Sequence, residues 1–355
     1  MPQAVDALTA RVDKALSDFL DGRAAALAGV GPDLDAVLVT ARASVLDGGK
    51  RLRPRFTYWG WRTVRDAVDD DDALVTVAAS LELLHACALV HDDVMDGSDT
   101  RRGHPATHAV FAAMHRAARW PGDARVFGTA AAIVLGDLLL SWADAMYAGA
   151  AVPPACARHT RQVYDDMRQL VMAGQYLDVL VQARGEFSIE DALRVAEYKT
   201  SKYTVEGPLH LGAAAAGAPR EVFDVLSAYG IALGEAFQLR DDVLGVFGDP
   251  SLTGKPAGDD LREGKRTLLV ALAMQAASTV EAELLRHELG DRSLDEAGVA
   301  ALREVIVSTG ALAQVEQRIA HRAAEARRAL RTEAVSDDAR EALDALAVAA
   351  SERHT

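Results

Sequence analysis

The sequence predicts an all-α protein, a single large helical bundle. Apolar residues, mostly Ala and Leu, recur at helical spacing along almost the whole chain, whereas the alternating pattern typical of strands is hard to find. The segments between breaks are about 15–25 residues long, which allows about ten or more helices. No repeat or low-complexity linker divides the chain, so residues 1–355 are expected to form one domain.

Short breaks rich in Gly, Pro and Asp mark the ends of these helices. Ser188, with Asp191 three residues later, matches a capping box and predicts a helix start. Ser336, which two Asp residues follow, predicts another. The breaks lie at 47–49, 97–105, 120–122, 152–154, 184–185, 217–219, 248–264 and 290–291.

The charge balance limits the possible partners. The chain carries 38 Lys and Arg against 52 Asp and Glu, a formal net charge of −14. This acidic excess argues against nucleic acid as a partner, because such binding depends on Lys and Arg at phosphates. A small anionic substrate is not excluded, since a basic cluster or a bound metal can reverse the sign locally.

The number of cysteines and the length of the apolar stretches indicate the cellular compartment of the protein. Two cysteines, Cys87 and Cys156, are too few for a disulfide framework, which fits a reducing cytoplasm. The N-terminal segment carries frequent charges and no apolar signal-peptide core. The most apolar stretch, 129–143, is interrupted by Asp137 and is too short to span a bilayer. We therefore expect a soluble, cytoplasmic protein without an integral membrane segment.

An aspartate cluster ends the first long apolar segment. Residues 73–95 contain neither Gly nor Pro and follow an acidic run, which favours one long helix. Asp92 and Asp96 lie four residues apart, on one helical face, where like charges repel. Negative side chains at the negative end of a helix indicate a site for a hard cation such as Mg²⁺. Arg101 and Arg102 follow on a loop and suit phosphate oxygens. The alternative is a solvated acidic helix end that pairs with these arginines.

The same pattern occurs a second time downstream. An apolar run ends in Asp241 and Asp242, and a Gly-rich loop with Lys255 and Lys265 follows. Two such sites facing each other would clamp a diphosphate through bridging metal ions. The repetition favours metal-assisted phosphate chemistry over an accidental acidic helix end.

In these features the sequence resembles the trans-isoprenyl diphosphate synthases, the polyprenyl synthetase family, and most of all a geranylgeranyl diphosphate synthase. GGKRLRP at 48–54 is similar to the family's isopentenyl-diphosphate-binding motif GGKRxRP. DDVMD at 92–96 matches the first aspartate-rich motif, DDxxD, and KT at 199–200 matches the family's Lys-Thr pair. FQLRDD at 237–242 is similar to the second aspartate-rich motif. The motifs stand in the family's order over about residues 40–270.

The resemblance implies a role for each matching residue. The implied Mg²⁺ ligands, for three ions per active site, are Asp92, Asp93, Asp96, Asp241 and Asp242. The implied catalytic residues are Lys199, Thr200 and Gln238 together with Asp92, Asp96 and Asp241. The residues implied to hold isopentenyl diphosphate are Gly49, Lys50, Arg53, His85 and Arg102. Those implied to hold the allylic diphosphate are Arg101, Lys199, Lys255 and Lys265.

The implied activity is the Mg²⁺-dependent, head-to-tail (1'-4) condensation of isopentenyl diphosphate with an allylic diphosphate to an all-trans prenyl diphosphate, by a homodimer. Ionising the allylic diphosphate separates charge, so the leaving group requires a preorganised cluster of Mg²⁺, Lys and Arg. The carbocation requires a dry, apolar pocket, so the resemblance also implies a central apolar cavity in the helical bundle. One position departs from the family pattern, because Gly245 stands where the second motif usually has its last Asp. Asp249 is a candidate substitute.

The residues before the first motif predict the length of the product. In this family the growing chain extends along that helix, and side chains upstream of Asp92 form its floor. Ala88 and Cys87 are small, whereas bulky aromatic residues there would stop growth at about fifteen carbons. Leu84 and Leu81 lie one and two turns further down. The predicted product is geranylgeranyl diphosphate (C20), with C15 and C25 or longer as alternatives.

Two functions of other classes are alternatives. A class I terpene cyclase shares the metal-triggered ionisation, but it has no use for the isopentenyl-diphosphate motif at 48–54. A non-catalytic subunit that modulates an active partner has less reason to carry both acidic motifs and the lysines.

Overall fold

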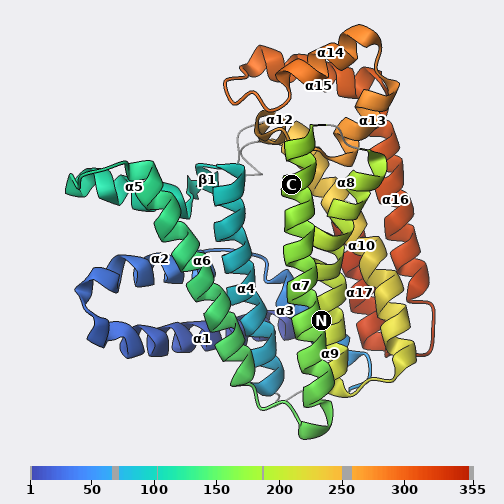
Figure 1. Ribbon diagram of the computed structural model, residues 1–355. Coiled ribbons are helices and arrows are strands. Elements are labelled where there is room, and N and C mark those ends of the chain that lie inside the picture. The colour runs from blue at the N-terminus through green and yellow to red at the C-terminus, as the bar shows by residue number, and fades with distance from the viewer. Residues whose placement is uncertain (1, 66–71, 102, 186–187, 250–257, 352–355) are drawn as a thin grey trace. The chain divides into compact units, whose positions relative to one another are not determined.

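The computed structural model of the chain is almost wholly helical, as the sequence predicts (Figure 1). It describes residues 2–65, 72–101, 103–185, 188–249 and 258–351. The helices form two compact units, which we describe one at a time: Met1–Tyr58 with Asp66–Ala157, and Trp59–Arg65 with Arg158–Thr355. The all-α prediction is confirmed. One domain with a central apolar cavity stays a prediction.

The described part of the first unit is helical except for one two-stranded ribbon. Thr100 pairs with Pro105 and Arg101 with His104, so this short ribbon is an exception to the helices that the sequence pattern predicts. Gly103, with a φ of 78°, provides the conformation that such a tight turn requires. The elements are α1 (Pro2–Leu27), η1 (Ala28–Val30), η2 (Pro32–Leu34), α2 (Asp35–Leu46), α3 (Leu52–Arg62, which ends in the second unit), α4 (Asp72–Asp96), β1 (Thr100–Arg101), β2 (His104–Pro105), α5 (Thr107–Ala118) and α6 (Ala124–Ala148).

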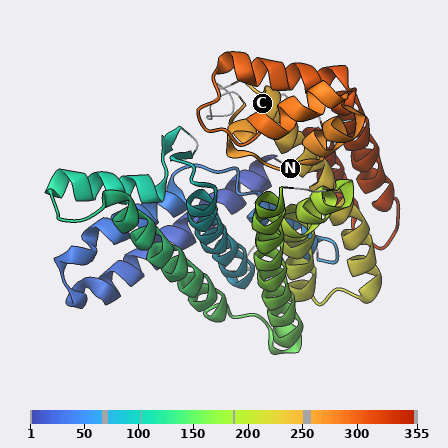
Figure 2. The same ribbon diagram turned by 45° about the horizontal axis from the view of Figure 1, so that its top comes forward.

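Helix α4 runs through the core of the first unit. It has 25 residues, so it is roughly 37 Å long, and the side chains of Val77, Leu81 and Leu83 are fully buried. Helix α6 lies beside it in both views (Figures 1 and 2). At Gly136 of α6 the His91 side chain packs directly against the glycine, and a Cβ atom there would lie 2.0 Å from His91 Nε2. The prediction of one long helix ending at the first aspartate cluster is confirmed.

The described part of the second unit is also helical. Its core includes Leu239, Leu269, Ile306 and Val315, each at most 1% exposed. The elements are α7 (Pro154–Arg184, which begins in the first unit), α8 (Ile189–Val195), the π-helical segment η3 (Ala196–Glu206), α9 (Gly207–Ala216), α10 (Arg220–Phe247), α12 (Asp259–Glu263), α13 (Leu268–Ala276), α14 (Thr279–Glu288), α15 (Glu296–Ser308), α16 (Ala311–Ala329) and α17 (Asp337–Ser351).

Both helix starts that the sequence predicts are confirmed. The Ser188 hydroxyl accepts a hydrogen bond from the Asp191 amide at 3.1 Å, and the Asp191 carboxylate accepts one from the Ser188 amide at 3.0 Å. At the start of α17, the Ser336 hydroxyl accepts from the Ala339 amide at 3.3 Å. Local capping chemistry therefore defines these two boundaries.

Three helices, α4, α6 and α10, are long and apolar enough to cross a membrane by length and composition alone, and the bent pair α15 and α16 would count as a fourth. The expectation that the stretch 129–143 is too short is therefore wrong, because it continues into the 25 residues of α6. Of the apolar window of α4, 72% is buried inside the protein, against 39% for α6. The apolar side chains of α4 are thus mostly buried inside the protein.

Candidate active site

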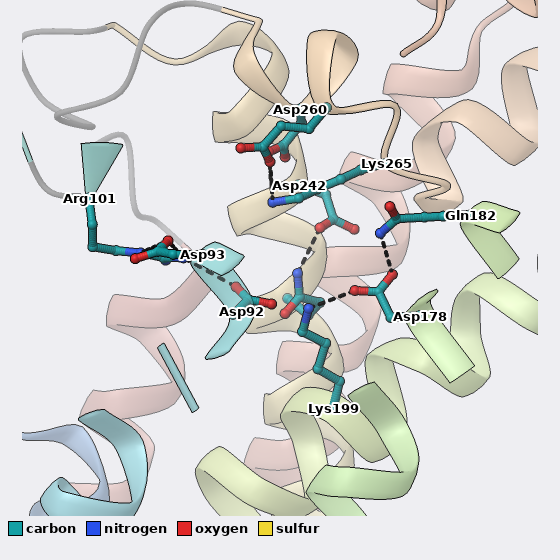
Figure 3. A network of polar contacts seen from close by, with 11 residues as sticks. Asp92, Asp93, Arg101, Asp178, Gln182, Lys199, Asp242, Asp260 and Lys265 are labelled. Carbon is teal, nitrogen blue, oxygen red and sulfur yellow. Dashed lines mark hydrogen bonds and ion pairs between the residues drawn. The ribbon is translucent and has the colours of Figure 1, made fainter. Parts of the chain in front are cut away.

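The first aspartate cluster lies at the C-terminal end of α4. Asp93 and Asp96 are only 3% and 7% exposed. From β1, Arg101 donates hydrogen bonds through Nε to Asp93 at 2.8 Å and through Nη2 to Asp92 at 3.2 Å (Figure 3). Burial alone would lower the pKa of Arg101, but the charges and hydrogen bonds of the two aspartates raise it above its usual value. Arg102, the second arginine predicted here, lies outside the described residues.

A buried arginine fixes the basic loop before α3. Gly48 and Gly49 have φ angles of 84° and 104°, which favour glycine, and Arg51 itself has a φ of 47°. The Arg51 guanidinium lies 2.8 Å from a carboxylate oxygen of Glu82 on α4 and 2.8 Å from one of Asp13 on α1. Burial would lower the pKa of Arg51, but these two carboxylates raise it. The ion pairs thus attach the loop to α4.

This attachment brings the predicted isopentenyl-diphosphate residues toward one part of the first unit. Gly49 and Lys50 are exposed on the loop, and Arg53 lies buried in the first turn of α3. His85 is half-buried on α4, three residues after the Glu82 that holds the loop, and so on the same helical face.

The second aspartate cluster lies at the C-terminal end of α10 and forms a chain of hydrogen bonds. The Thr200 hydroxyl donates to Gln238 Oε1, and Gln238 Nε2 donates to Asp242 Oδ1 at 2.7 Å. Asp242 is 7% exposed, whereas Asp241 is exposed. The structure therefore brings Thr200 to two predicted residues of α10, Gln238 and Asp242, that lie about 40 residues further along the chain.

Lys199 and Thr200 are held by η3, whose backbone is in close contact with two helices. A Cβ atom on Gly174 of α7 would lie 2.5 Å from the Lys199 amide nitrogen. A Cβ atom on Gly234 of α10 would lie 2.4 Å from Ser201 Cα. π-Helical turns are rare and are frequent at functional sites. Here the two glycines let α7 and α10 fix the segment that carries both predicted residues.

The charge balance around Asp242 differs from that around the first aspartate cluster. Burial raises the pKa of Asp242 to about 8; the hydrogen bond from Gln238 lowers it, the charges of Asp260 and Asp241 raise it, and Lys265 lowers it. Lys265 Nζ lies 3.2 Å from Asp260 Oδ1, so this predicted lysine belongs to the same group (Figure 3). Without a metal ion, this carboxyl group keeps its proton at neutral pH. Lys255 lies outside the described residues.

Sequence reasoning missed Asp178 and gave no role to Asp260. Lys199 Nζ donates to Asp178 Oδ2 at 2.6 Å, and Gln182 Nε2 donates to Asp178 Oδ1 at 3.3 Å (Figure 3). One feature of the sequence could have indicated Asp178: it follows Gly174, a glycine inside a long helix, by one turn.

The residues present fit Mg²⁺. The donors are carboxylates, which this ion prefers, and burial, with the charges of Asp260 and Asp241, raises the pKa of Asp242, an effect that a bound cation would oppose. In the part of the chain that the structure describes, no three His, Cys, Asp or Glu side chains are arranged to hold a metal ion by themselves. Mg²⁺ takes one or two carboxylates and completes its shell with water and substrate phosphates.

Comparison with known proteins identifies the family. The chain matches the polyprenyl synthetase family over residues 36–306. It is 34% identical over 304 residues to a geranylfarnesyl diphosphate synthase of Aeropyrum pernix, which covers 84% of this chain and 88% of that protein. It is 33% identical over 272 residues to a (2E,6E)-farnesyl diphosphate synthase of Mycobacterium tuberculosis, covering 74% and 68%.

A solved structure is similar over nearly the full length. The crystal structure of a geranylgeranyl pyrophosphate synthase from Corynebacterium glutamicum, complexed with isoprenyl diphosphate and magnesium, has a TM-score of 0.94 at 40% identity. The alignment covers 98% of this chain and 99% of that one.

The fold and the family match together define an enzyme of prenyl diphosphate chemistry. The chain belongs to the polyprenyl synthetase family, and it is a trans-isoprenyl diphosphate synthase, a prenyltransferase. The family match does not support the terpene cyclase alternative.

Proposed function

We propose that the protein joins isopentenyl diphosphate head to tail to allylic diphosphates and releases an all-trans prenyl diphosphate, chiefly geranylgeranyl diphosphate. The observation that carries the proposal is the pair of acidic helix ends, each with its own polar partners. Arg101 pairs with Asp92 and Asp93 at one end, and Gln238 donates to Asp242 at the other. The relative from C. glutamicum, solved with magnesium and isoprenyl diphosphate, supports these ligands for this chain.

In this proposal the aspartates of both ends hold Mg²⁺ and the cations hold the allylic diphosphate. The proposed magnesium ligands, for three ions, are Asp92, Asp93, Asp96, Asp241 and Asp242. When bound, Mg²⁺ would offset the negative charge that develops on the diphosphate leaving group. Arg101, Lys199, Lys255 and Lys265 bind its oxygens. The diphosphate released in the reaction accepts the proton that the product loses, so no protein base is required.

The hydrogen-bonded chain from Thr200 to Asp242 has a separate role in this proposal. Thr200 fixes the side-chain amide of Gln238, because its hydroxyl donates to Oε1 and leaves Nε2 to donate to Asp242. The oriented oxygen dipoles of Thr200 and Gln238 then lie beside the developing allylic cation and stabilise it without supplying a nucleophile.

Isopentenyl diphosphate is held by the basic loop and by α4. Gly49, Lys50, Arg53, His85 and Arg102 form this proposed site. The buried Arg51–Glu82 pair supports the proposal, because it fixes the loop to α4 one turn before His85. The loop keeps Gly49 and Lys50 exposed and available for a diphosphate.

Sequence identity does not decide the product length, because relatives of similar identity are named for geranylfarnesyl and farnesyl products. The side chains of α4 support the C20 product instead. Ala88 lies one turn before Asp92 on the same face. The Cys87 sulfur lies 3.8 Å from His91 Nδ1, and His91 in turn contacts the Ile133 carbonyl of α6 at 3.1 Å. Position 88, rather than 87, therefore forms the floor in this proposal.

We further propose a cytoplasmic homodimer. The apolar side chains of Val126, Ile133 and Val134 on α6 are 68%, 44% and 63% exposed. Their spacing places them on one helical face, and a second copy of the chain would cover this face. The small number of cysteines, Cys87 and Cys156, suits a reducing compartment.

The proposal is tested by product analysis. Purified protein is incubated with isopentenyl diphosphate and C5, C10 or C15 allylic primers, with Mg²⁺ or with chelator, and products are identified by mass. We expect C20 diphosphate only with Mg²⁺. In Ala88→Phe the main product should shorten to C15, whereas Ala86→Val, on another face of α4, is the control.

The other outcomes discriminate among the alternatives. Hydrocarbon products would indicate a cyclase, and no Mg²⁺-dependent consumption would indicate a non-catalytic subunit. A C20 product in Ala88→Phe would contradict the floor position alone.

A further inference from the structure

The serine that caps α17 also holds the end of α3. The Ser336 hydroxyl donates a hydrogen bond to the Arg62 carbonyl at 2.8 Å and accepts one from the Ala339 amide at 3.3 Å. The Ser336 amide donates to the Thr63 carbonyl at 3.0 Å. The last carbonyls of a helix have no partner inside it, and these bonds satisfy two of them. One residue thus joins the start of α17 to the end of α3.

Two arginines at the end of α3 strengthen this contact. Arg62 is 8% exposed, and its Nη2 donates to Asp338 Oδ2 at 2.7 Å. Its Nε donates to the Arg65 carbonyl at 3.2 Å. Arg65 in turn donates through Nε and Nη2 to the Ala216 carbonyl, at 3.3 and 3.2 Å, where α9 ends. The end of α3 is therefore held by both α17 and α9.

The backbone of α3 is also in close contact with α9. A Cβ atom on Gly60 would lie 2.0 Å from the Leu209 carbonyl oxygen, so the two helices touch through their main chains here. The neighbouring Trp59 is 3% exposed. The C-terminal part of α3 therefore cannot shift without moving the helices around it in the second unit.

The other end of α3 carries the proposed isopentenyl-diphosphate site. Arg53 lies in its first turn, and Gly49 and Lys50 lie on the loop just before it. In that loop Arg51 has a φ of 47°, and a non-glycine residue keeps such a conformation only where its surroundings fix it. The geometry of the loop therefore depends on how α3 is held.

We propose that Ser336 is a positioning residue for isopentenyl diphosphate: by holding the end of α3, it fixes the direction of this helix and hence the place of Arg53 and of the loop. The inference rests on the proposed isopentenyl-diphosphate site. Arg53 and Arg62 are separated by roughly 14 Å along the helix axis. Ser336 therefore acts through α3 and not by contact with the substrate.

A cap that only stabilises the fold makes a different prediction, and Ser278 provides the matched control. It caps α14, and its hydroxyl accepts from the Glu281 amide at 3.4 Å. Within the second unit, α14 and α9 lie at opposite ends in both views (Figures 1 and 2). Ser336→Ala and Ser278→Ala should each lower the melting temperature by a few degrees, because each removes a helix cap. Only Ser336→Ala also releases α3.

The experiment measures steady-state kinetics of the full-length protein, with each substrate varied in turn at saturating Mg²⁺. We expect Ser336→Ala to raise the KM for isopentenyl diphosphate about fivefold, the effect of about one hydrogen bond. The KM for the allylic primer and kcat should stay within about twofold. Ser336→Thr keeps the hydroxyl and should bring the KM back to within about twofold of the wild type. Ser278→Ala should leave all three constants within about twofold.

A second variant keeps the test decisive if Ser336→Ala does not fold. Asp338→Asn removes the partner of Arg62 and leaves the cap in place. It should raise the KM for isopentenyl diphosphate about threefold without changing that for the allylic primer.

Two results would overturn the inference: an unchanged KM for isopentenyl diphosphate in the folded variants of Ser336 and Asp338, or an equal rise in Ser278→Ala. A parallel rise in the KM of both substrates would also overturn it, because the effect would not be specific to α3. Failure of the wild type to consume isopentenyl diphosphate would instead overturn the proposed function.

Discussion

The two aspartate-rich helix ends follow the same sequence pattern but balance their charges differently. At the end of α4, Arg101 forms ion pairs with Asp92 and Asp93, so a cation lies beside these two carboxylates. At the end of α10, Asp242 receives a hydrogen bond from an amide, and burial raises its pKa to about 8. The first end is balanced by a cation and the second by a retained proton.

This difference shows that an acidic motif alone does not define a charge state. A buried carboxylate must be paired, protonated or bound to metal, because an isolated charge in the interior is too costly. The first end is paired and the second is protonated. Substitutions that remove charge partners should therefore act strongly at the first end, and substitutions that remove hydrogen bonds should act weakly at the second.

The largest effect is expected for Arg101→Leu. It leaves Asp93, 3% exposed, without its guanidinium partner. We expect the free energy of unfolding of the metal-free protein to fall by about 3 kcal/mol, measured by urea denaturation. Arg101→Lys keeps the charge but not the forked geometry, and should recover about half of the loss. Equal stability of wild type and Arg101→Leu would mean that the first end is not balanced by this arginine.

The variant Glu82→Gln tests the buried ion pair between Arg51 and Glu82 in the first unit. Arg51 and Glu82 are 6% and 5% exposed, so their ion pair is buried. Its loss should loosen the basic loop and raise the KM for isopentenyl diphosphate about tenfold, with kcat within about twofold. The KM for the allylic primer serves as the internal control. A parallel rise in both KM values would contradict a role specific to this loop.

Much of this comparison could be predicted from the sequence, and the limits are physical. The helix ends at Asp92 and Asp242 could be found because local rules, helical period and like-charge spacing, reveal them. The neighbours that decide the charge state could not. Asp178 and Asp260 come from other helices, and only the packed backbone shows that they contact Lys199 and the space beside Gly245. No local pattern encodes such a long-range approach.

A smaller, pH-dependent effect is expected at the second end. The folded protein raises the pKa of Asp242 from its ordinary 3.8 to about 8. Between these values the folded state retains a proton that the unfolded state has lost, so stability falls as pH rises through this window and levels off above it. In the metal-free protein, Asp242→Asn removes this pH-dependent loss of stability, because asparagine does not ionise. Its melting temperature relative to the wild type should rise by a few degrees between about pH 4.5 and pH 8.5.

The exposed neighbour Asp241 is the control for this measurement. Asp241→Asn removes one carboxylate from the same helix turn without removing the buried group. It should therefore show a much smaller change with pH. If the melting-temperature difference for Asp242→Asn is the same at both pH values, Asp242 is ionised in the folded state. The carboxylates at the two helix ends then have the same charge state.

The smallest effect is expected for Thr200→Val, which removes a neutral hydrogen bond. Thr200 is 8% exposed and donates to Gln238, so the isosteric valine should reduce the free energy of unfolding by only about 1 kcal/mol. Turnover should fall about tenfold, because Gln238 loses the contact that orients it beside the allylic group. Thr204→Val, on the same π-helical segment and similarly buried at 5% exposure, controls for the substitution itself. A stability loss in Thr200→Val as large as that of Arg101→Leu would show that hydrogen bonds stabilise the second end as strongly as charge pairing stabilises the first.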